Sequence, residues 1–174
     1  MDRIQLNGVW YIKESLTLQD ERYQPDYSII NLDVITYRNG DSIPEVKNPK
    51  EWKKLTTGAY CYYDNDPSKG ILYNWYAVND PRNLAPLGWK IPNNKEIDSL
   101  HLKRNSQFNG FCERNGVFHG FDDYVFWWTS SESTMNKAWA RYLSKNYDNI
   151  YKNNSLKKDG CSVRCVKESL YINY

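Results

Sequence analysis

The sequence predicts one domain of the α+β class, built from two short helices, antiparallel sheets and many loops. Its length of 174 residues is that of a single domain. Apolar residues follow helical spacing in two early segments, residues 71–78 and 92–101. Residues 111–166 instead contain short alternating segments between turn residues, with no helical period. Helices that are separate from a later antiparallel sheet are typical of an α+β domain.

The first part of the chain has little regular pattern. Residues 1–30 contain one short alternating segment, Val9–Ile12, which predicts an edge strand before an irregular connection. Residues 50–55 predict a single helical turn after an Asn-Pro pair. Residues 59–63 are dense in aromatic side chains and predict a strand that ends at an Asp-Asn-Asp-Pro turn.

The two predicted helices follow. Residues 71–78 place apolar and aromatic side chains on one helical face. The second helix is expected from residue 92 to about residue 101, with an Asn-Asn pair capping its start and with Ile97 and Leu100 on its buried side. Residues 89–91 predict a short strand between the two helices.

Turn residues divide the remainder into strands. The predicted turns are Asn115-Gly116, Asp122-Asp123, Ser131-Glu132-Ser133, Asp148-Asn149 and Asp159-Gly160. Between them, Trp127 and Trp128 are consecutive strand residues, so one ring is expected to face the core and the other to face outward or onto another layer.

The composition predicts a core made of aromatic rings. Mean hydropathy is −0.81, yet the chain holds 15 Tyr and 7 Trp. Each of these side chains combines a large apolar face with one polar group, which suits both a core and a ligand platform.

Charge and hydropathy argue against two kinds of partner. The formal net charge is +2 and the pI is about 8.2. The lysines lie among acidic residues rather than in a basic stripe: Lys50, Lys53, Lys54, Lys157 and Lys158. We therefore expect no nucleic-acid partner. No stretch approaches the roughly 20 apolar residues of a membrane span, so we expect no membrane span either.

The four cysteines leave two alternatives open. Cys61, Cys112, Cys161 and Cys165 are an even number, which is compatible with two disulfides. Four free thiols in a reducing compartment are an equal alternative.

No metal, cofactor or catalytic residue is expected. Residues 64–66, Asp-Asn-Asp, carry oxygen ligands suited to Ca²⁺, but an Asx turn before Pro67 explains them without a metal. His101 and His119 have no carboxylate or cysteine at the spacing of metal ligands, so structural or solvated roles are expected for both.

Several blocks of the sequence together resemble one family. They are residues 31–40, 58–67, 72–78, 88–92, 126–132 and 161–166, rich in aromatic and turn residues. This series resembles the Fibrobacter succinogenes major paralogous (FISUMP) domain, a family with a C-type-lectin-like fold. The resemblance implies a domain over residues 31–168, between a divergent segment 1–30 and a tail 169–174 that are candidate docking arms. It also implies surface-exposed, non-catalytic modules.

The resemblance carries two structural expectations. In the lectin-like fold the first and last strands lie together, which would pair residues 59–63 with residues 163–167. The family often has a cysteine where this chain has Ala85, paired with the cysteine of the block that contains Cys165. That bridge is absent here, and a compensating bridge to Cys112 is the alternative.

A candidate ligand surface lies late in the chain. In lectin-like folds this region forms the ligand face, and Tyr, Trp, Arg and Asn are typical of adaptable binding surfaces. The candidate residues are Trp139, Arg141, Tyr147, Asn149, Tyr151, Asn153 and Asn154. A Tyr-rich solvated sheet is the competing interpretation.

Three functions follow, in order of preference. The first is a non-enzymatic recognition or adhesion module that binds a glycan, peptide or protein on a cell or virion surface. The second is a structural phage virion protein, a head or tail decoration, favoured by the Tyr, Asn and Lys richness of a chain without a secretory signal. The third, least favoured, is an oxidase like the formylglycine-generating enzymes, using Cys161 and Cys165. The expected location is the cell surface if a signal has been trimmed, and otherwise a phage virion.

Overall fold

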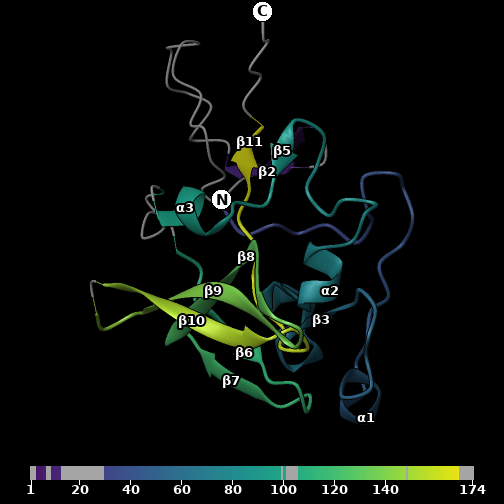
Figure 1. Ribbon diagram of the computed structural model, residues 1–174, viewed down its shortest axis with the longest axis vertical. Helices are drawn as coiled ribbons and strands as arrows, with labels where there is room; N and C mark the ends of the chain where they lie inside the picture. Colours follow the sequence, from purple (N-terminus) through teal and green to yellow (C-terminus); the bar gives the residue numbers. More distant parts are fainter. Residues whose placement is uncertain are drawn as a thin grey trace, which may run out of the picture.

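The computed structural model describes residues 30–98, 100, 106–147 and 149–168, and the backbone of two strands near the N-terminus (Figure 1). These strands, β1 (Arg3–Leu6) and β2 (Val9–Ile12), pair antiparallel. The strand predicted at Val9–Ile12 is therefore present, and its partner β1 is an addition to the prediction. The rest of segment 1–29 and the tail 169–174 lie outside the described residues.

The described helices all lie between residues 49 and 98, among short strands, and the longer strands follow, which fits the expected α+β class. The elements between residues 49 and 98 are α1 (Pro49–Trp52), β3 (Tyr60–Tyr62), η2 (Tyr63–Asn65), η3 (Pro67–Lys69), β4 (Ile71–Tyr73), α2 (Trp75–Val78), β5 (Trp89–Lys90) and α3 (Asn94–Asp98). Those that follow are β6 (Asn109–Cys112), β7 (Phe118–Phe121), β8 (Tyr124–Thr134), β9 (Lys137–Ser144), β10 (Ile150–Leu156) and β11 (Val166–Lys167).

The largest sheet has five strands in the order β10-β9-β8-β6-β7, and Figure 1 shows it below α3 and beside α2. Its neighbouring strands run antiparallel except β6 and β8, which meet through a single parallel pair, Gly110 with Val125. The sheet is thus mixed, whereas the sequence predicted only antiparallel pairing.

Gly110 is required where β6 passes between β7 and β8. Its φ is 64°, in the left-handed region that glycine adopts without strain. A Cβ at this position would lie 2.3 Å from the carbonyl oxygen of His119. The absence of a Cβ at Gly110 therefore allows the close approach of β6 and β7.

The helix predicted for residues 71–78 is wrong in its first half. Ile71–Tyr73 form strand β4, which pairs with β3, and only Trp75–Val78 are helical. Asn74 marks the change, because its side chain accepts hydrogen bonds from Ala77 N at 3.0 Å and Ala59 N at 3.1 Å. The strand residues are buried on both faces, and such a run gives no strand period in the sequence.

The other helices lie where the sequence placed them. Asn48 caps α1, which makes the single turn expected for residues 50–55. Asn93 caps α3 by accepting hydrogen bonds from Lys95 N at 2.8 Å and Glu96 N at 3.0 Å. Helix α3 ends at Asp98, before the predicted end at His101, which lies outside the described residues.

The predicted pairing of residues 59–63 with residues 163–167 is wrong. Strand β3 pairs with β4, and β11 pairs with β5. The physical reason lies in the surroundings of Tyr60. On one side it is paired with Tyr73 of β4. On the other side its N–H donates to Pro44 O at 3.0 Å, and its carbonyl accepts from Val46 N at 2.9 Å. Both hydrogen-bonding edges of β3 are occupied, so no edge is free for the last strand.

One predicted turn is also wrong. Ser131–Ser133 continue β8, which runs to Thr134, and the chain reverses at Met135 and Asn136. Irregular register after Trp128 lets the strand bend there instead of ending.

The core is aromatic, as the composition predicted, and the indole N–H groups of its most buried tryptophans have partners. Four tryptophans are almost fully buried: Trp52, Trp75, Trp127 and Trp128. Their indole N–H groups donate to Lys158 O at 2.9 Å, Thr129 O at 2.9 Å, Asn31 Oδ1 at 2.8 Å and Tyr73 O at 2.8 Å, respectively. Trp127 and Trp128 lie on opposite sides of β8 in two different clusters, so both sides of this strand are covered at that point.

Candidate functional site

Five aromatic rings form a continuous ladder across the main sheet, one from each strand. In sheet order they are Tyr151 on β10, Tyr142 on β9, Phe126 on β8, Phe111 on β6 and His119 on β7. Successive ring centroids lie 5.2, 5.1, 4.7 and 5.3 Å apart. We call these five residues the aromatic ladder.

Strand register produces the ladder. Tyr142 is the direct cross-strand partner of both Tyr151 and Phe126, and Phe111 is the partner of His119. Side chains directly opposite each other on one face of a sheet are in contact. The parallel β6–β8 pair then brings Phe111 next to Phe126 and joins the two halves of the ladder.

The ladder side of the sheet is only half covered. Towards α2, Trp128, Ala138 and Ala140 are fully buried in the main core cluster. Farther along the same strands, Phe126 and Tyr142 are half-buried, and Tyr151 is 39% exposed. The uncovered half therefore presents aromatic side chains to solvent.

A groove of about 530 Å³ follows this uncovered half, and we call it the aromatic groove. Phe111, Phe126 and Tyr142 provide its aromatic side chains. The other lining residues are polar or aliphatic: Arg114, Lys137, Asn153, Asn154, Ser155, Leu156 and Asp159. Its volume falls in the range of small-ligand sites, and aromatic side chains with a few polar groups are typical of them.

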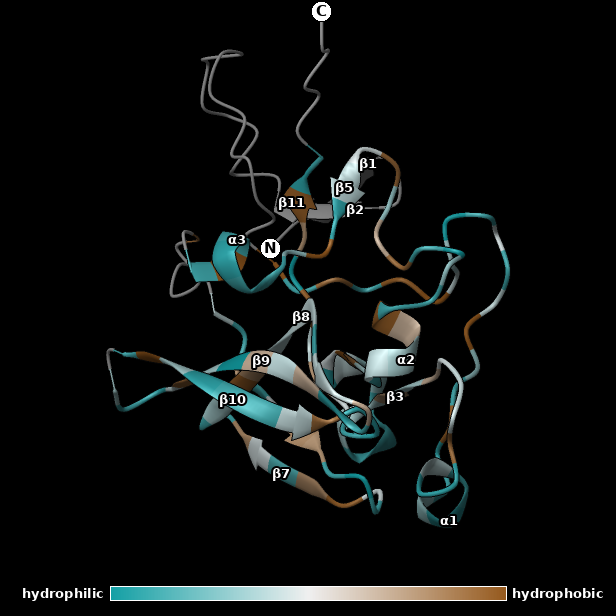
Figure 2. Ribbon diagram, viewed as in Figure 1, coloured by the Kyte–Doolittle hydropathy of each residue, from teal (hydrophilic) through white to brown (hydrophobic). Residues whose placement is uncertain are grey.

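Strand β10 supplies much of the polar wall. Figure 2 colours most of this strand hydrophilic, in contrast with the strands packed in the core. Asn153 Nδ2 donates to Ser155 Oγ at 2.7 Å, which fixes the amide orientation along the groove.

Asp159 lies where the groove meets two turns. Its carboxylate accepts hydrogen bonds from Arg114 N and Leu156 N, each at 2.9 Å. Burial is the largest cause that raises the pKa of Asp159, to about 6, against the lowering effect of these two bonds. The charge of the groove therefore changes in the mildly acidic range.

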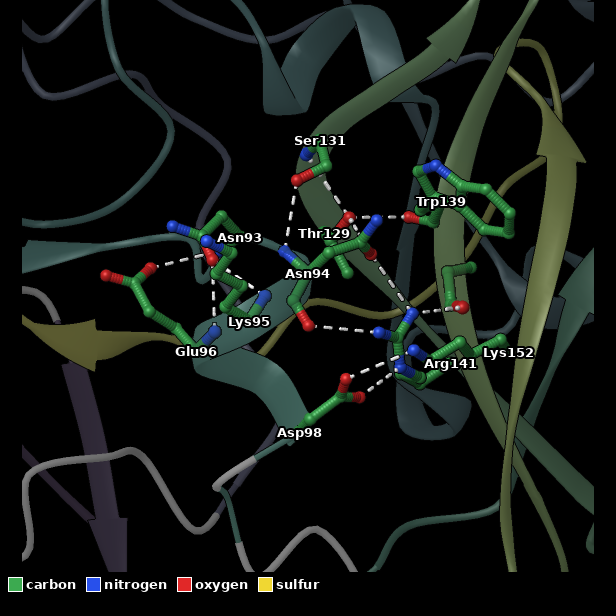
Figure 3. Close-up of polar contacts among 11 residues, drawn as sticks. Asn93, Asn94, Lys95, Glu96, Asp98, Thr129, Ser131, Trp139, Arg141 and Lys152 are labelled. Carbon is green, nitrogen blue, oxygen red and sulfur yellow. Dashed lines mark hydrogen bonds and ion pairs between the residues drawn. The ribbon is translucent and has the colours of Figure 1, made fainter.

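The opposite side of the sheet is closed by α3. Arg141 is 1% exposed, and Figure 3 shows its guanidinium pointing at the helix. Arg141 Nε donates to Asp98 Oδ1 at 2.8 Å, and its Nη1 and Nη2 donate to Asn94 Oδ1 and O, each at 3.1 Å. Lys152 completes an ion pair with Asp98 at 3.4 Å. The hydrogen bond from Arg141 lowers the pKa of Asp98.

One family model matches part of the chain, less than half of its length. Residues 30–108 match the model of the Fibrobacter succinogenes major domain. The resemblance noted from the sequence is therefore confirmed over these residues. Neither the curated proteins nor the solved structures gave a match.

The match to the Fibrobacter succinogenes major domain ends one residue before β6 begins. It includes α3, which covers the Arg141 side of the sheet, whereas the five strands of the sheet itself follow it. The aromatic groove thus lies outside the matched part, and it is described from its own geometry.

The seven candidate residues fall in three places. Asn153 and Asn154 line the groove, and Tyr151 ends the ladder. Tyr147, 66% exposed, and Asn149 lie at the β9–β10 turn, at the other end of the hairpin from Lys137 and Leu156.

The other two candidates lie away from the groove. Trp139 shares the α3 side of β9 with Arg141, and its carbonyl accepts a hydrogen bond from Thr129 Oγ1 at 2.9 Å. Arg141 itself is inaccessible to a ligand, because it is buried and bound to α3. The structure thus brings only part of the predicted set together.

Sequence reasoning missed most of the groove. Phe111, Phe126, Tyr142 and Asp159 come from β6, β8, β9 and the turn after β10. The available signal was an aromatic residue at matching positions of neighbouring strands, but reading it requires the register. The parallel β6–β8 pair could not be read from local pattern at all.

All four cysteines are buried free thiols. A hydrogen bond to the Cys112 thiol, with burial, raises the pKa of Cys61, and both residues belong to one core cluster. Burial also raises the pKa of Cys161, and that of Cys165 to about 12. Thiolate chemistry requires a lowered pKa, so the environments of Cys61, Cys161 and Cys165 oppose it.

The remaining polar candidates have local partners. Asp66 caps η3 by accepting from Ser68 N at 2.9 Å, which is the Asx turn expected before Pro67. His119 lies 3.4 Å from Glu113 Oε2 and stacks on Phe111. Within the described residues, no group of three His, Cys, Asp or Glu side chains is arranged to hold a metal, and no helix could span a membrane.

Proposed function

We propose that the protein is a non-enzymatic recognition module that binds a glycan in the aromatic groove. The observation that carries this proposal is the groove itself, a hollow of about 530 Å³ on an otherwise well-packed sheet. Aromatic side chains exposed in such a hollow cost solvation energy unless a ligand covers them.

The chemistry of the walls favours a glycan over a peptide. The amide, hydroxyl and phenol groups of Asn153, Ser155 and Tyr142 each both donate and accept hydrogen bonds. Sugar hydroxyls have the same double character, and the C–H surface of a sugar ring suits an aromatic floor. Peptide anchors generally fill deeper, fully desolvated pockets.

The fold and the location belong to the same proposal. We take the fold to be C-type-lectin-like, supported by short helices beside a mixed sheet and by the match over residues 30–108. The pairing of residues 59–63 with residues 163–167 that this fold implies is not formed and is no part of this support. Glycans are displayed on cell surfaces, so a recognition role places the protein on a cell or virion surface.

Asparagine substitutions on one hairpin test this proposal. Asn153→Ala removes an amide from the groove, and Asn149→Ala removes an exposed amide from the far end of the same hairpin. We expect Asn153→Ala to weaken glycan capture about tenfold, since a lost hydrogen bond costs about 1.5 kcal/mol. Asn149→Ala is expected to bind as the unmodified protein does. Binding to an oligosaccharide array, with thermal melting of each variant, provides the measurement.

The array result decides the proposal. Equal loss with both variants, or loss with Asn149→Ala alone, would move the binding surface to the hairpin turn. Absence of binding to every neutral and acidic oligosaccharide would reject glycan recognition.

A structural assembly role is the second candidate, and a different surface favours it. Leu84, Pro86 and Leu87 line a separate groove of about 440 Å³, and Leu87 is 75% exposed. An apolar patch of this kind suits contact with a second copy of the chain. Light scattering across concentration, with Leu87→Ser as the variant, measures this: a dimer lost in the variant would support assembly, and a monomer throughout would reject it.

A further inference from the structure

A second hollow of about 330 Å³ adjoins the aromatic groove, and we call it the basic recess. Its lining residues are Lys53, Tyr76, Arg114, Asn136, Leu156 and Lys158. Arg114 and Leu156 line both hollows, so the groove and the recess are neighbours that meet at these two residues.

The charged side chains that line the recess are all cationic. The lining contains three cationic side chains, Lys53, Arg114 and Lys158, and no carboxylate. Lys158 Nζ donates to Lys53 O at 2.9 Å, which holds the ammonium at the recess. Among the residues that the structure describes, none of the three forms an ion pair within 4.0 Å.

The nearby carboxylates have other partners. Asp159 accepts from the backbone N–H groups of Arg114 and Leu156. Glu113 accepts from Asn115 Nδ2 at 3.0 Å and contacts His119 on the ladder side. Among the described residues, the charge of Arg114 acts on Asp159 and lowers its pKa, but neither Lys53 nor Lys158 has an ion-pair partner. Like charges gathered in one recess repel each other, so an anionic group would relieve this repulsion.

We propose that the basic recess receives the anionic group of an acidic glycan, whose sugar ring lies in the adjoining aromatic groove. This inference rests on the proposed function and specifies its ligand class. The shared ligand chemistry is an exposed anionic oxygen group, either the carboxylate of a uronic acid or a sulfate ester. Arg114 stands at the junction and offers a planar fork of N–H donors suited to either group.

Other anionic polymers fit this arrangement less well. Single-stranded nucleic acid requires cations that follow its backbone. Here the three cations gather at one end of the aromatic groove. An acidic peptide would bring its own amide groups but no sugar ring for the aromatic floor.

Matched ligand pairs test the inference by calorimetry. An oligouronate is compared with its carboxyl-reduced form, and a sulfated oligosaccharide with its desulfated form. We expect one acidic ligand to bind about tenfold more tightly than its neutral partner at low salt, and this advantage to shrink as salt screens the charges. The pair that shows the advantage identifies carboxylate or sulfate as the source.

A double variant and its control locate the effect. Lys53→Gln with Lys158→Gln is expected to remove the acidic preference, read as the ratio of the affinities for the acidic and the neutral ligand of each pair. Lys47→Gln with Lys95→Gln changes the net charge equally at exposed positions away from the recess, and it is expected to keep the preference. Thermal melting of both variants shows that each is folded.

The outcomes are distinct. Equal binding of acidic and neutral ligands overturns the inference and leaves glycan recognition standing. Stronger binding of a polyglutamate peptide or a single-stranded oligonucleotide than of either acidic glycan also overturns it. Failure of every saccharide, neutral or acidic, overturns the proposed function together with the inference.

Discussion

The two sides of the five-stranded sheet use the same strands for opposite purposes. Arg141 and Tyr142 are consecutive residues of β9, yet Arg141 is fixed against α3 and Tyr142 lines an open groove. Strand alternation alone produces this division, since adjacent side chains point to opposite faces. The comparison teaches that residue type along β9 and β10 says little about accessibility until the covering elements are known.

The largest expected effect is on the closed side. Arg141→Ala would remove the cation that joins β9 to α3, so Asp98 would keep only its ion pair with Lys152 and Asn94 would lose the guanidinium donor. We expect a loss of about 3 kcal/mol in unfolding free energy, at the low end for a broken buried ion pair because Asp98 is half-exposed. Urea denaturation measures it. A loss below about 1 kcal/mol would show that α3 does not depend on Arg141.

Tyr142→Ala is the matched change on the open side. Removing the ring breaks its stacking with Phe126 and Tyr151, so a smaller loss of about 1–2 kcal/mol is expected, together with loss of glycan capture. The same urea experiment and the oligosaccharide array provide the two measurements. An equal loss of unfolding free energy in Arg141→Ala and Tyr142→Ala would contradict the contrast between the closed and the open side of the sheet.

The charge of Asp159 gives a pH test of the open side. Below its pKa of about 6 the carboxyl becomes neutral, so the groove and recess become more positive. Affinity for an acidic glycan is therefore expected to rise about threefold between pH 7 and pH 5, the size of a single moderately screened charge interaction. Asp159→Asn should bind at pH 7 as the unmodified protein binds at pH 5. A pH dependence that persists in Asp159→Asn would assign the effect to another group.

The two aspartates themselves provide the finest comparison. The pKa of Asp159 is raised, so ionising it costs stability, and that cost disappears as pH falls from about 6 towards the usual value of 3.8. The pKa of Asp98 is lowered by Arg141, so its contribution to stability is present above pH 3.8 and is lost as pH falls further. Carboxyl NMR titration should therefore give midpoints on opposite sides of 3.8. Two midpoints on the same side would contradict the contrast.

The sequence predicted local features well because they depend on local chemistry. Asn93 was expected to cap a helix, and it does so. The aromatic composition predicted a core of Trp and Tyr rings, and the core contains them. The helix predicted for residues 71–78 failed because burial on both faces of β4 hides the strand period.

Features that depend on distant partners were predicted less well. The predicted pairing of residues 59–63 with residues 163–167 is wrong because both edges of β3 are already occupied, one by β4 and the other by residues 44–46. Among the candidate site residues, Asn153 was placed near the groove from composition, whereas Arg141 could not be separated from it without knowledge of α3. Phe111 lies beside Phe126 because β6 pairs in parallel with β8, and no local sequence pattern predicts that pairing.

The single parallel pair between β6 and β8 has a consequence for local opening. Hairpin β6–β7 is joined to β8 through Gly110 and Val125 and to the last turn through two bonds between Cys112 and Gly160, at 2.9 and 2.7 Å. So few backbone bonds make this hairpin a natural unit of local unfolding. The aromatic groove crosses the contact between β6 and β8, with Phe111 on β6 and Phe126 on β8. An occupied groove would therefore slow amide hydrogen exchange throughout the hairpin, including backbone groups that no ligand touches.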